Sequence, residues 1–253
     1  MSKCFLYHAG AAIGVAVLVS TVLGGGTVRQ HWLFVDLLDS EWADLAASAR
    51  RLTVADGTLL FRRGDPTPGL HLVEEGAIKI YTLTGSGDER IIDILGPGEL
   101  CGEMGVVDGG ASTAWGEAWG DSRLWVIPAD LAQRLLRTNP QIAWQVSRLL
   151  VAKLRIASQQ VDEAIFLRSR DRVIRQMLRL CDRYGQSDGE GLRISLRMTH
   201  EEIARMAGTA RETVSRTLGE LQDRSILAFR ERFMLIRDPA ALRALAEAEP
   251  HPF

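Results

Sequence analysis

The chain has 253 residues, of which 46% are hydrophobic and 25% are charged, and its formal net charge is −2. This length accommodates one large or two modest domains with a buried core, and the ordinary charge content excludes global disorder. Three cysteines, at positions 4, 101 and 181, are too few and too scattered for a disulfide framework or a cysteine-rich metal module.

The small net charge conceals two regions of opposite sign. The segment from Leu167 to Phe253 contains 16 Arg, no Lys and 13 acidic residues, so it carries +3 and the preceding segment carries −5. Glycine is also uneven, with 14 of the 24 glycines between Gly57 and Gly120, and glycine favours turns over helices. The sequence therefore predicts a turn-rich β unit, a helix, and a small arginine-rich helical unit.

An apolar stretch, Phe5 to Leu23, lies within an N-terminal extension of residues 1–30. Its 19 residues, at about 1.5 Å each, just suffice to cross a hydrocarbon core of roughly 30 Å. Only Lys3 precedes it and three arginines follow it, which weakly favours a cytoplasmic C-terminal side. A membrane tether, a cleaved signal, a translation start further downstream and a non-native extension all stay open.

Residues 31–138 are predicted to form an antiparallel β-roll that follows a short helix. Apolar residues at helical spacing predict that helix over Glu41–Arg51, with Ser40 as its N-cap. Short runs bounded by glycine-containing turns follow, and strands without βαβ alternation are typical of a sandwich or barrel-like roll. The expected strands are Thr58–Phe61, Leu70–Glu74, Ala77–Leu83, Arg90–Leu95, Ser112–Ala118 and Leu124–Pro128.

A long helix is expected over residues 139–166, where helical periodicity begins and Pro140 suits a first helical position. Its apolar residues form two adjacent rows, one beginning at Ile142 and the other containing Leu154 and Val161. One interpretation is a helix that packs on the core. The other is a coiled-coil dimer seam, which would explain apolar residues on two faces.

Residues 167–253 are predicted to form a separate helical unit that begins with an amphipathic helix over Arg172–Tyr184. Two S/T-x-x-E capping boxes follow, Thr199 with Glu202 and Thr209 with Glu212, and each starts a short helix. Gly208 lies between these helices, where a residue with positive φ is often required. This spacing is typical of a helix-turn-helix.

The second of these helices has a groove side. On a wheel of about 100° per residue, Arg211, Glu212, Ser215 and Arg216 lie together, opposite an apolar row. In a recognition helix such positions enter the major groove, where Arg pairs with guanine, Glu with cytosine N4, and Ser with a base or a phosphate. The alternative is that Glu212 only caps the helix and pairs with Arg216 four residues later.

Two strands, Ile226–Arg230 and Phe233–Ile236, complete a wing whose arginines reach phosphates. The predicted fold class is α+β: an N-terminal antiparallel β-roll, a long dimerisation helix and a C-terminal winged helix-turn-helix. This order, with RETVSR at 211–216, Gly64-Asp65 and Gly102-Glu103, resembles the Crp–Fnr transcription regulators over roughly Leu33 to Leu245.

The resemblance implies an effector-binding roll, a dimerising helix and two recognition helices that read an inverted repeat. It places these candidate residues at the DNA: Thr199, Arg211, Glu212, Ser215 and Arg216. Arg211, Glu212 and Arg216 match the readers of cyclic-AMP receptor type members, whereas Glu212, Ser215 and Arg216 match the E-x-x-S-R pattern of Fnr-type members. The half-site that is read therefore stays open between the two groups.

The resemblance also implies an effector site at Gly102, Glu103, Ser112, Thr113 and Ser158. Ser112 stands where cyclic-nucleotide binders have a phosphate-holding Arg, and Ala157 stands where they have a Thr that faces adenine. Losing that Arg removes a charge-assisted bond worth on the order of 1.5–3 kcal/mol. A cyclic nucleotide is therefore possible but disfavoured, an iron–sulfur cluster is disfavoured by the cysteine spacing, and no cofactor is certain.

The sequence thus predicts a homodimeric, cytoplasmic, sequence-specific DNA-binding transcription regulator, and no nucleophile–base pair or metal-ligand set points to an enzyme. Its expected partners are a double-stranded DNA operator, a second copy, RNA polymerase and an unidentified small-molecule effector, with membrane association left open. The alternatives are a cyclic-AMP-responsive regulator, a membrane-tethered signalling protein with the same DNA-binding unit, and a ligand-free, constitutively active dimer.

Overall fold

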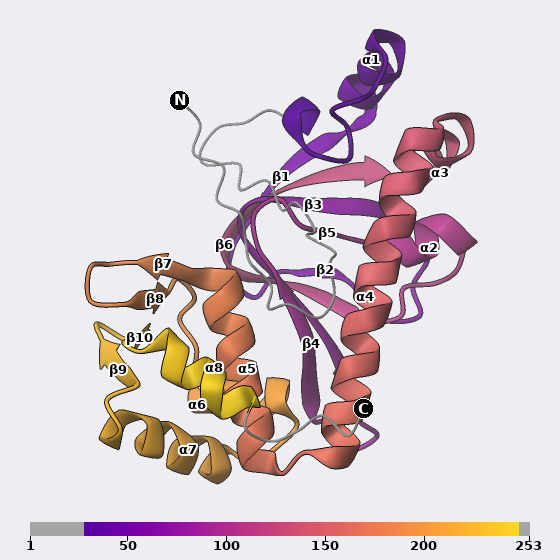
Figure 1. Ribbon diagram of the computed structural model, residues 1–253. Coiled ribbons are helices and arrows are strands. Elements are labelled where there is room, and N and C mark those ends of the chain that lie inside the picture. Colours follow the sequence, from indigo (N-terminus) through magenta and orange to yellow (C-terminus); the bar gives the residue numbers. More distant parts are fainter. Residues whose placement is uncertain (1–27, 248–253) are drawn as a thin grey trace. The chain divides into compact units, whose positions relative to one another are not determined.

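The computed structural model describes residues 28–247 (Figure 1). These residues form two compact units, which divide between Arg155 and Ile156. Each unit is described by itself below. The apolar stretch Phe5–Leu23 lies outside the described residues. Within the described part of the chain, every helix is too short or too polar to span a bilayer.

The first unit opens with a 3-10 turn, η1 (Val28–Gln30), and helix α1 (Asp39–Ser48). The predicted helix Glu41–Arg51 was wrong at both ends. The helix starts earlier because the Glu41 carboxylate accepts a hydrogen bond from the Leu38 N–H at 3.0 Å, so that Leu38 is the N-cap. It stops earlier because the residues that follow it pair with a later strand as β1.

One antiparallel sheet of six strands forms the roll, as predicted. Its order is β1-β6-β3-β4, with β2 paired to β6 and β5 paired to β3. The strands are β1 (Arg50–Val54), β2 (Leu59–Phe61), β3 (Gly69–Leu83), β4 (Glu89–Leu95), β5 (Leu100–Cys101) and β6 (Trp115–Pro128).

Strands β3 and β6 are each continuous where the sequence predicted two strands separated by a turn. Their pairing register shifts between Val73 and Ala77 instead, and the Ser122 hydroxyl bonds both the N–H and the carbonyl of Ala77 at 3.1 Å. A bulge of this kind bends and twists a strand without reversing it. Gly76, with φ of 75°, therefore marks a bend in β3 and not a hairpin.

Two helices of this unit were not predicted: α2 (Glu103–Asp108) and α3 (Ala129–Thr138). Both are short, and α2 lies in the glycine-rich region that suggested turns alone. Their apolar side chains join α1 and the sheet in one buried cluster, which includes Leu45, Leu70, Val106, Ile127, Leu131 and Leu135. One core of this unit therefore lies between the sheet and these helices, and a second lies among the strands themselves.

Helix α4 (Pro140–Phe166) begins at the predicted proline and is capped by the buried Asn139. The Asn139 Oδ1 accepts from the N–H groups of Gln141 and Ile142 at 3.0 and 3.2 Å, which satisfies two free donors of the first turn. One face of α4 is buried at Ile142 and Val146. A second row is exposed, at Trp144, Val151, Leu154, Val161 and Ile165.

The second unit is a winged helix-turn-helix, as predicted. Its elements are α5 (Ser169–Tyr184), β7 (Gly185–Ser187), β8 (Leu192–Ile194), α6 (His200–Ala207), α7 (Arg211–Asp223), β9 (Leu227–Arg230), β10 (Phe233–Ile236) and α8 (Pro239–Glu247). The four strands form one antiparallel sheet in the order β7-β8-β10-β9. A single cluster of buried residues from α5 to α8 holds the unit together.

Candidate DNA-binding surface and effector site

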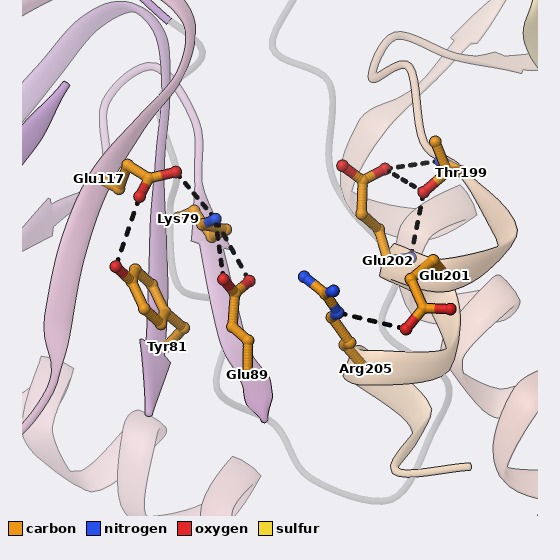
Figure 2. Close-up of polar contacts among 8 residues, drawn as sticks. All are labelled: Lys79, Tyr81, Glu89, Glu117, Thr199, Glu201, Glu202 and Arg205. Carbon is orange, nitrogen blue, oxygen red and sulfur yellow. Dashed lines mark hydrogen bonds and ion pairs between the residues drawn. The ribbon is translucent and has the colours of Figure 1, made fainter. Parts of the chain in front are cut away.

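Helix α6 begins at a complete capping box, as the sequence predicted (Figure 2). The Thr199 Oγ1 accepts from the Glu202 N–H at 3.2 Å, and the Glu202 carboxylate accepts from the N–H and hydroxyl of Thr199 at 2.6 and 2.9 Å. The Thr199 hydroxyl proton is thereby used, and a hydroxyl has only one. The structure thus shows Thr199 as a helix cap, and its contact with DNA stays a prediction.

The turn between α6 and α7 has the expected glycine, but the second predicted capping box is wrong. Gly208 adopts the left-handed conformation with φ of 60°. Helix α7 begins at Arg211 after an Ala210 N-cap, and no side chain caps it. This start places Glu212 at the second helical position, where it is out of register with a box beginning at Thr209. Glu212 is therefore not used as a cap.

Helix α7 separates an apolar face from a polar one. Val214, Leu218 and Leu221 are fully buried. Four exposed polar side chains, called the groove face here, lie on the other side: Arg211, Glu212, Ser215 and Arg216. Among residues 28–247, the three charged members form no ion pair or side-chain hydrogen bond, so the alternative Glu212–Arg216 pair is absent. Their donors and acceptors are available to an external ligand.

Two arginines of α5 position the helix-turn-helix, and sequence reasoning did not identify them. Arg170 forms a two-pronged ion pair with Glu220 of α7 at 2.5 and 2.9 Å, and its hydrogen bonds lower the pKa of the Glu220 carboxyl. Arg172 donates to the carbonyls of Ala207 and Gly208 at 3.0 and 2.8 Å. These bonds fix the end of α6 and the body of α7 relative to α5. Partners 35 to 50 residues apart leave no local sequence signal.

The wing carries arginines around a strained turn. Glu231 and Arg232, at its tip, both have positive φ, of 50° and 69°, a conformation that non-glycine residues rarely adopt. Next to this tip, the guanidinium groups of Arg193 and Arg197 lie 4.8 and 4.9 Å from the centre of the ring of Phe233, the first residue of β10. Stacking of this kind holds a guanidinium in place while its N–H donors stay accessible.

The candidate effector residues Gly102 and Glu103 lie at the start of α2. Gly102 has φ of 93°, and a Cβ there would collide with the Gly69 carbonyl, so the position requires glycine. Glu103 is buried, and its Oε1 pairs with Lys153 Nζ of α4 at 2.8 Å. Its Oε2 has no hydrogen-bond partner among the described residues. One buried acceptor therefore stays available in this site.

The remaining effector candidates offer no cation. Ser112 is held by its backbone, which bonds Asp65 and Gly64 at 2.9 and 2.8 Å, and Thr113 is exposed. A pocket of about 310 Å³ beside this loop is lined by uncharged residues only: Gly64, Pro66, Thr67, Gly105, Gly109, Gly110, Ala111, Ala129 and Gln133. Ser158 is exposed on α4 and belongs to the other compact unit. An anionic phosphate would thus find hydroxyls and N–H groups here.

An ionic and aromatic cluster on the sheet was not predicted (Figure 2). Lys79 Nζ pairs with Glu117 at 2.9 Å and Glu89 at 3.2 Å, and it lies 4.7 Å from the centre of the Tyr81 ring. Burial alone would lower the pKa of Lys79, but the two carboxylates raise it above its ordinary value. Lys79 therefore stays charged and links β3 to β4 and β6.

Known proteins resemble the chain in both units. Residues 51–139 match the cyclic nucleotide-binding domain, and residues 171–245 match the Crp-like helix-turn-helix domain. The cyclic AMP receptor protein of Thermus thermophilus is 33% identical over 210 residues, which cover 83% of this chain and 94% of that relative.

Two solved structures have the same fold. FixK2 from Bradyrhizobium japonicum superposes with a TM-score of 0.70 at 22% identity, over 78% of this chain and 96% of that chain. The c-di-GMP responsive global regulator CLP of Xanthomonas campestris has a TM-score of 0.65 at 25% identity, over 78% of this chain and 98% of that chain. With the two domain matches and the relative from Thermus, these findings show that the chain belongs to the Crp–Fnr family of DNA-binding transcription regulators.

Proposed function

We propose that this regulator binds an inverted repeat in double-stranded DNA as a homodimer, with α7 of each subunit in the major groove. The groove face of α7 carries the proposal, because four polar side chains are exposed above a fully buried apolar row. An exposed guanidinium without a carboxylate partner is suited to bidentate bonds with guanine O6 and N7, and an exposed carboxylate accepts from cytosine N4.

The contacts divide into base reading and backbone positioning. Arg211, Glu212, Ser215 and Arg216 read base edges, while the wing arginines contact the phosphate backbone near them. Thr199 supports this surface as the cap that starts α6, because its hydroxyl and its N–H already donate to Glu202. We assign these roles to residues 167–253, the effector response to residues 31–138, and dimerisation to residues 139–166. An RNA polymerase partner and a cytoplasmic location follow from the same function.

The exposed row of α4 supports the homodimer. Its apolar members recur at intervals of seven, three, seven and four residues: Trp144, Val151, Leu154, Val161 and Ile165. This is the a/d spacing of a coiled coil, in which such residues are covered by an identical helix. Leu154, with 69% of its surface exposed, is otherwise an unfavourable residue to present to water.

We infer an effector other than cyclic AMP. Support comes from Ser112, which replaces the phosphate-holding cation, and from the uncharged lining of the adjacent pocket. A cyclic-AMP-responsive regulator is the second candidate, and the buried Glu103 with its available Oε2 favours it. The named ligands of relatives differ, since one is called a cyclic AMP receptor protein and another c-di-GMP responsive.

The base-reading role is tested with purified protein and an operator selected from random duplexes, at a stated salt concentration. Replacing Arg211 or Arg216 by Ala should weaken operator binding by about 1–3 kcal/mol and relax the preference at one base position. Arg243→Ala is the control, because this arginine of α8 pairs with Asp182 at 2.5 Å and lies off the groove face. An equal loss on all sequences would assign the two arginines to phosphates.

A further inference from the structure

The Ser215 hydroxyl differs in its hydrogen bonding from three other hydroxyl groups in the helices of this protein. Ser147, Thr138 and Thr217 each donate to the carbonyl four residues earlier, at distances of 2.8, 3.0 and 2.8 Å. This back-bonding is the ordinary behaviour of serine and threonine inside helices. The Ser215 hydroxyl lies instead 2.8 Å from Nδ1 of His200, a residue of another helix.

His200 is held in place from three sides. It is the first residue of α6, directly after the capping box that fixes the start of that helix. Its ring centre lies 6.0 Å from that of Phe229 on β9 of the wing, and its Nδ1 contacts Ser215 of α7. The imidazole therefore connects the supporting helix, the recognition helix and the wing at one point beside the groove face.

The bond to His200 determines what the Ser215 hydroxyl can offer to DNA. A hydroxyl has one donor and two acceptor sites. If it donated to its own helix backbone, its proton would lie along the helix axis. Held by Nδ1 it stays turned toward the surface, where it accepts from a base amino group, or donates to an acceptor when Nδ1 carries the proton.

We propose that His200 is a positioning residue for DNA recognition, which acts through Ser215 by holding its hydroxyl away from the α7 backbone. The inference rests on the proposed reading of DNA by the groove face and extends it to α6. His200 itself makes no base contact in this arrangement, so its effect on operator binding depends on the presence of the Ser215 hydroxyl.

A double-mutant cycle on the full-length protein tests this dependence. Ser215→Ala and His200→Ala should each weaken operator binding about threefold to tenfold, the range for one net hydrogen bond. The double variant should bind no more weakly than either single variant, because both remove the same bond. Both should also shift the base preference at the same position of the half-site, which a merely structural defect would not do.

Two isosteric variants separate the role of Nδ1 from that of the ring. The amide of His200→Asn reaches the position of Nδ1 and should retain operator binding within about twofold, because it can still bond Ser215. The amide of His200→Gln reaches the position of Nε2 and should behave like His200→Ala. Thermal unfolding of every variant establishes that the fold is intact.

Three outcomes overturn the inference. Additive losses in the double variant would mean that His200 contacts DNA independently. Operator binding by His200→Ala equal to that of the unmodified protein would mean that the bond to Ser215 does not affect DNA binding. Rescue by Gln and not by Asn would assign the effect to Nε2. If the unmodified protein prefers no DNA sequence, the proposed function fails as well. If it selects an operator but the cycle is additive, only the role of His200 fails.

Discussion

Two buried histidines of the roll, His31 and His71, differ from ordinary surface histidines in their protonation. Burial lowers the pKa of each from 6.5 to about 4, and this effect outweighs the opposing hydrogen bonds to the backbone of Gly98 and Gly69. Both imidazoles are therefore neutral in the folded protein at neutral pH. Their contribution to stability depends on pH, because the unfolded chain protonates them more readily.

Folding stability should fall as the pH decreases from about 6.5 to about 4. Above pH 6.5 both states are unprotonated at these sites, whereas below it the unfolded state binds protons that the folded state excludes. The loss approaches about 3 kcal/mol per histidine near pH 4. Urea unfolding at pH 7, 5.5 and 4.5 measures it. His71→Phe, which keeps the ring volume, should be less pH-sensitive than the unmodified protein, and equal sensitivity would contradict the assignment.

At the scale of a single element, α4 carries two apolar faces, one buried and one exposed. Asn139 caps its first turn and also donates to Glu41 of α1 at 2.9 Å, so the buried face is tied to the roll. The exposed a/d row has no such partner within the described chain, and apolar rows of this length are seldom left in water. The helix therefore explains why the sequence shows two apolar rows and not one.

Replacing Leu154 by Glu should convert the proposed dimer into a monomer while the subunit stays folded. Leu154 is 69% exposed in the single chain, so a carboxylate there stays hydrated in the monomer. In the coiled-coil seam the same carboxylate would be buried without a partner, which is unfavourable in free energy. Light scattering coupled to size exclusion measures the mass. Gln159→Glu adds the same charge at an exposed position off the seam and should leave the mass unchanged. A monomeric unmodified protein would contradict the coiled-coil interpretation.

At the scale of the whole molecule, effector binding in the roll must alter DNA binding in the helix-turn-helix for the protein to act as a switch. The ion pair between Glu103 and Lys153 connects a buried carboxylate of α2 to the side chain of a residue on α4. A ligand that bonds to Glu103 would also change the environment of Lys153. The groups around Glu103 therefore determine whether the effector is a nucleotide or another small molecule, or whether the regulator has no effector.

Cyclic AMP should change operator affinity by less than about twofold, because Ser112 supplies no charge for the phosphate. Ser112→Arg should raise cyclic AMP affinity about tenfold or more, the value of one charge-assisted hydrogen bond. Titration calorimetry measures the binding, and Ser112→Gln, with a long but neutral side chain, is the control. Tight binding of cyclic AMP by the unmodified protein would contradict the conclusion that Ser112 leaves the phosphate without a charged partner.

The sequence by itself determined the features that depend on neighbours within a turn or along a strand. The Thr199–Glu202 capping box, the glycine turn at Gly208 and the polar face of α7 follow from spacings of three and four residues, and all three are present. The antiparallel roll and the order of the units were predicted as well. Such local patterns are decisive because amphipathic periodicity records directly which face is buried.

Only the tertiary structure decided the rest. It merged four predicted strand segments into β3 and β6, because a bulge and the Ser122 hydroxyl absorb the break at Gly76. It also brought Arg170 to Glu220, and His200 to Ser215. Pairs that lie 15 to 50 residues apart have no periodic signature, since their proximity depends on how separate elements pack. The physical reason is that the spacing of apolar residues specifies which face of a helix or strand is buried, whereas the packing of the elements specifies which residues of other elements that face contacts.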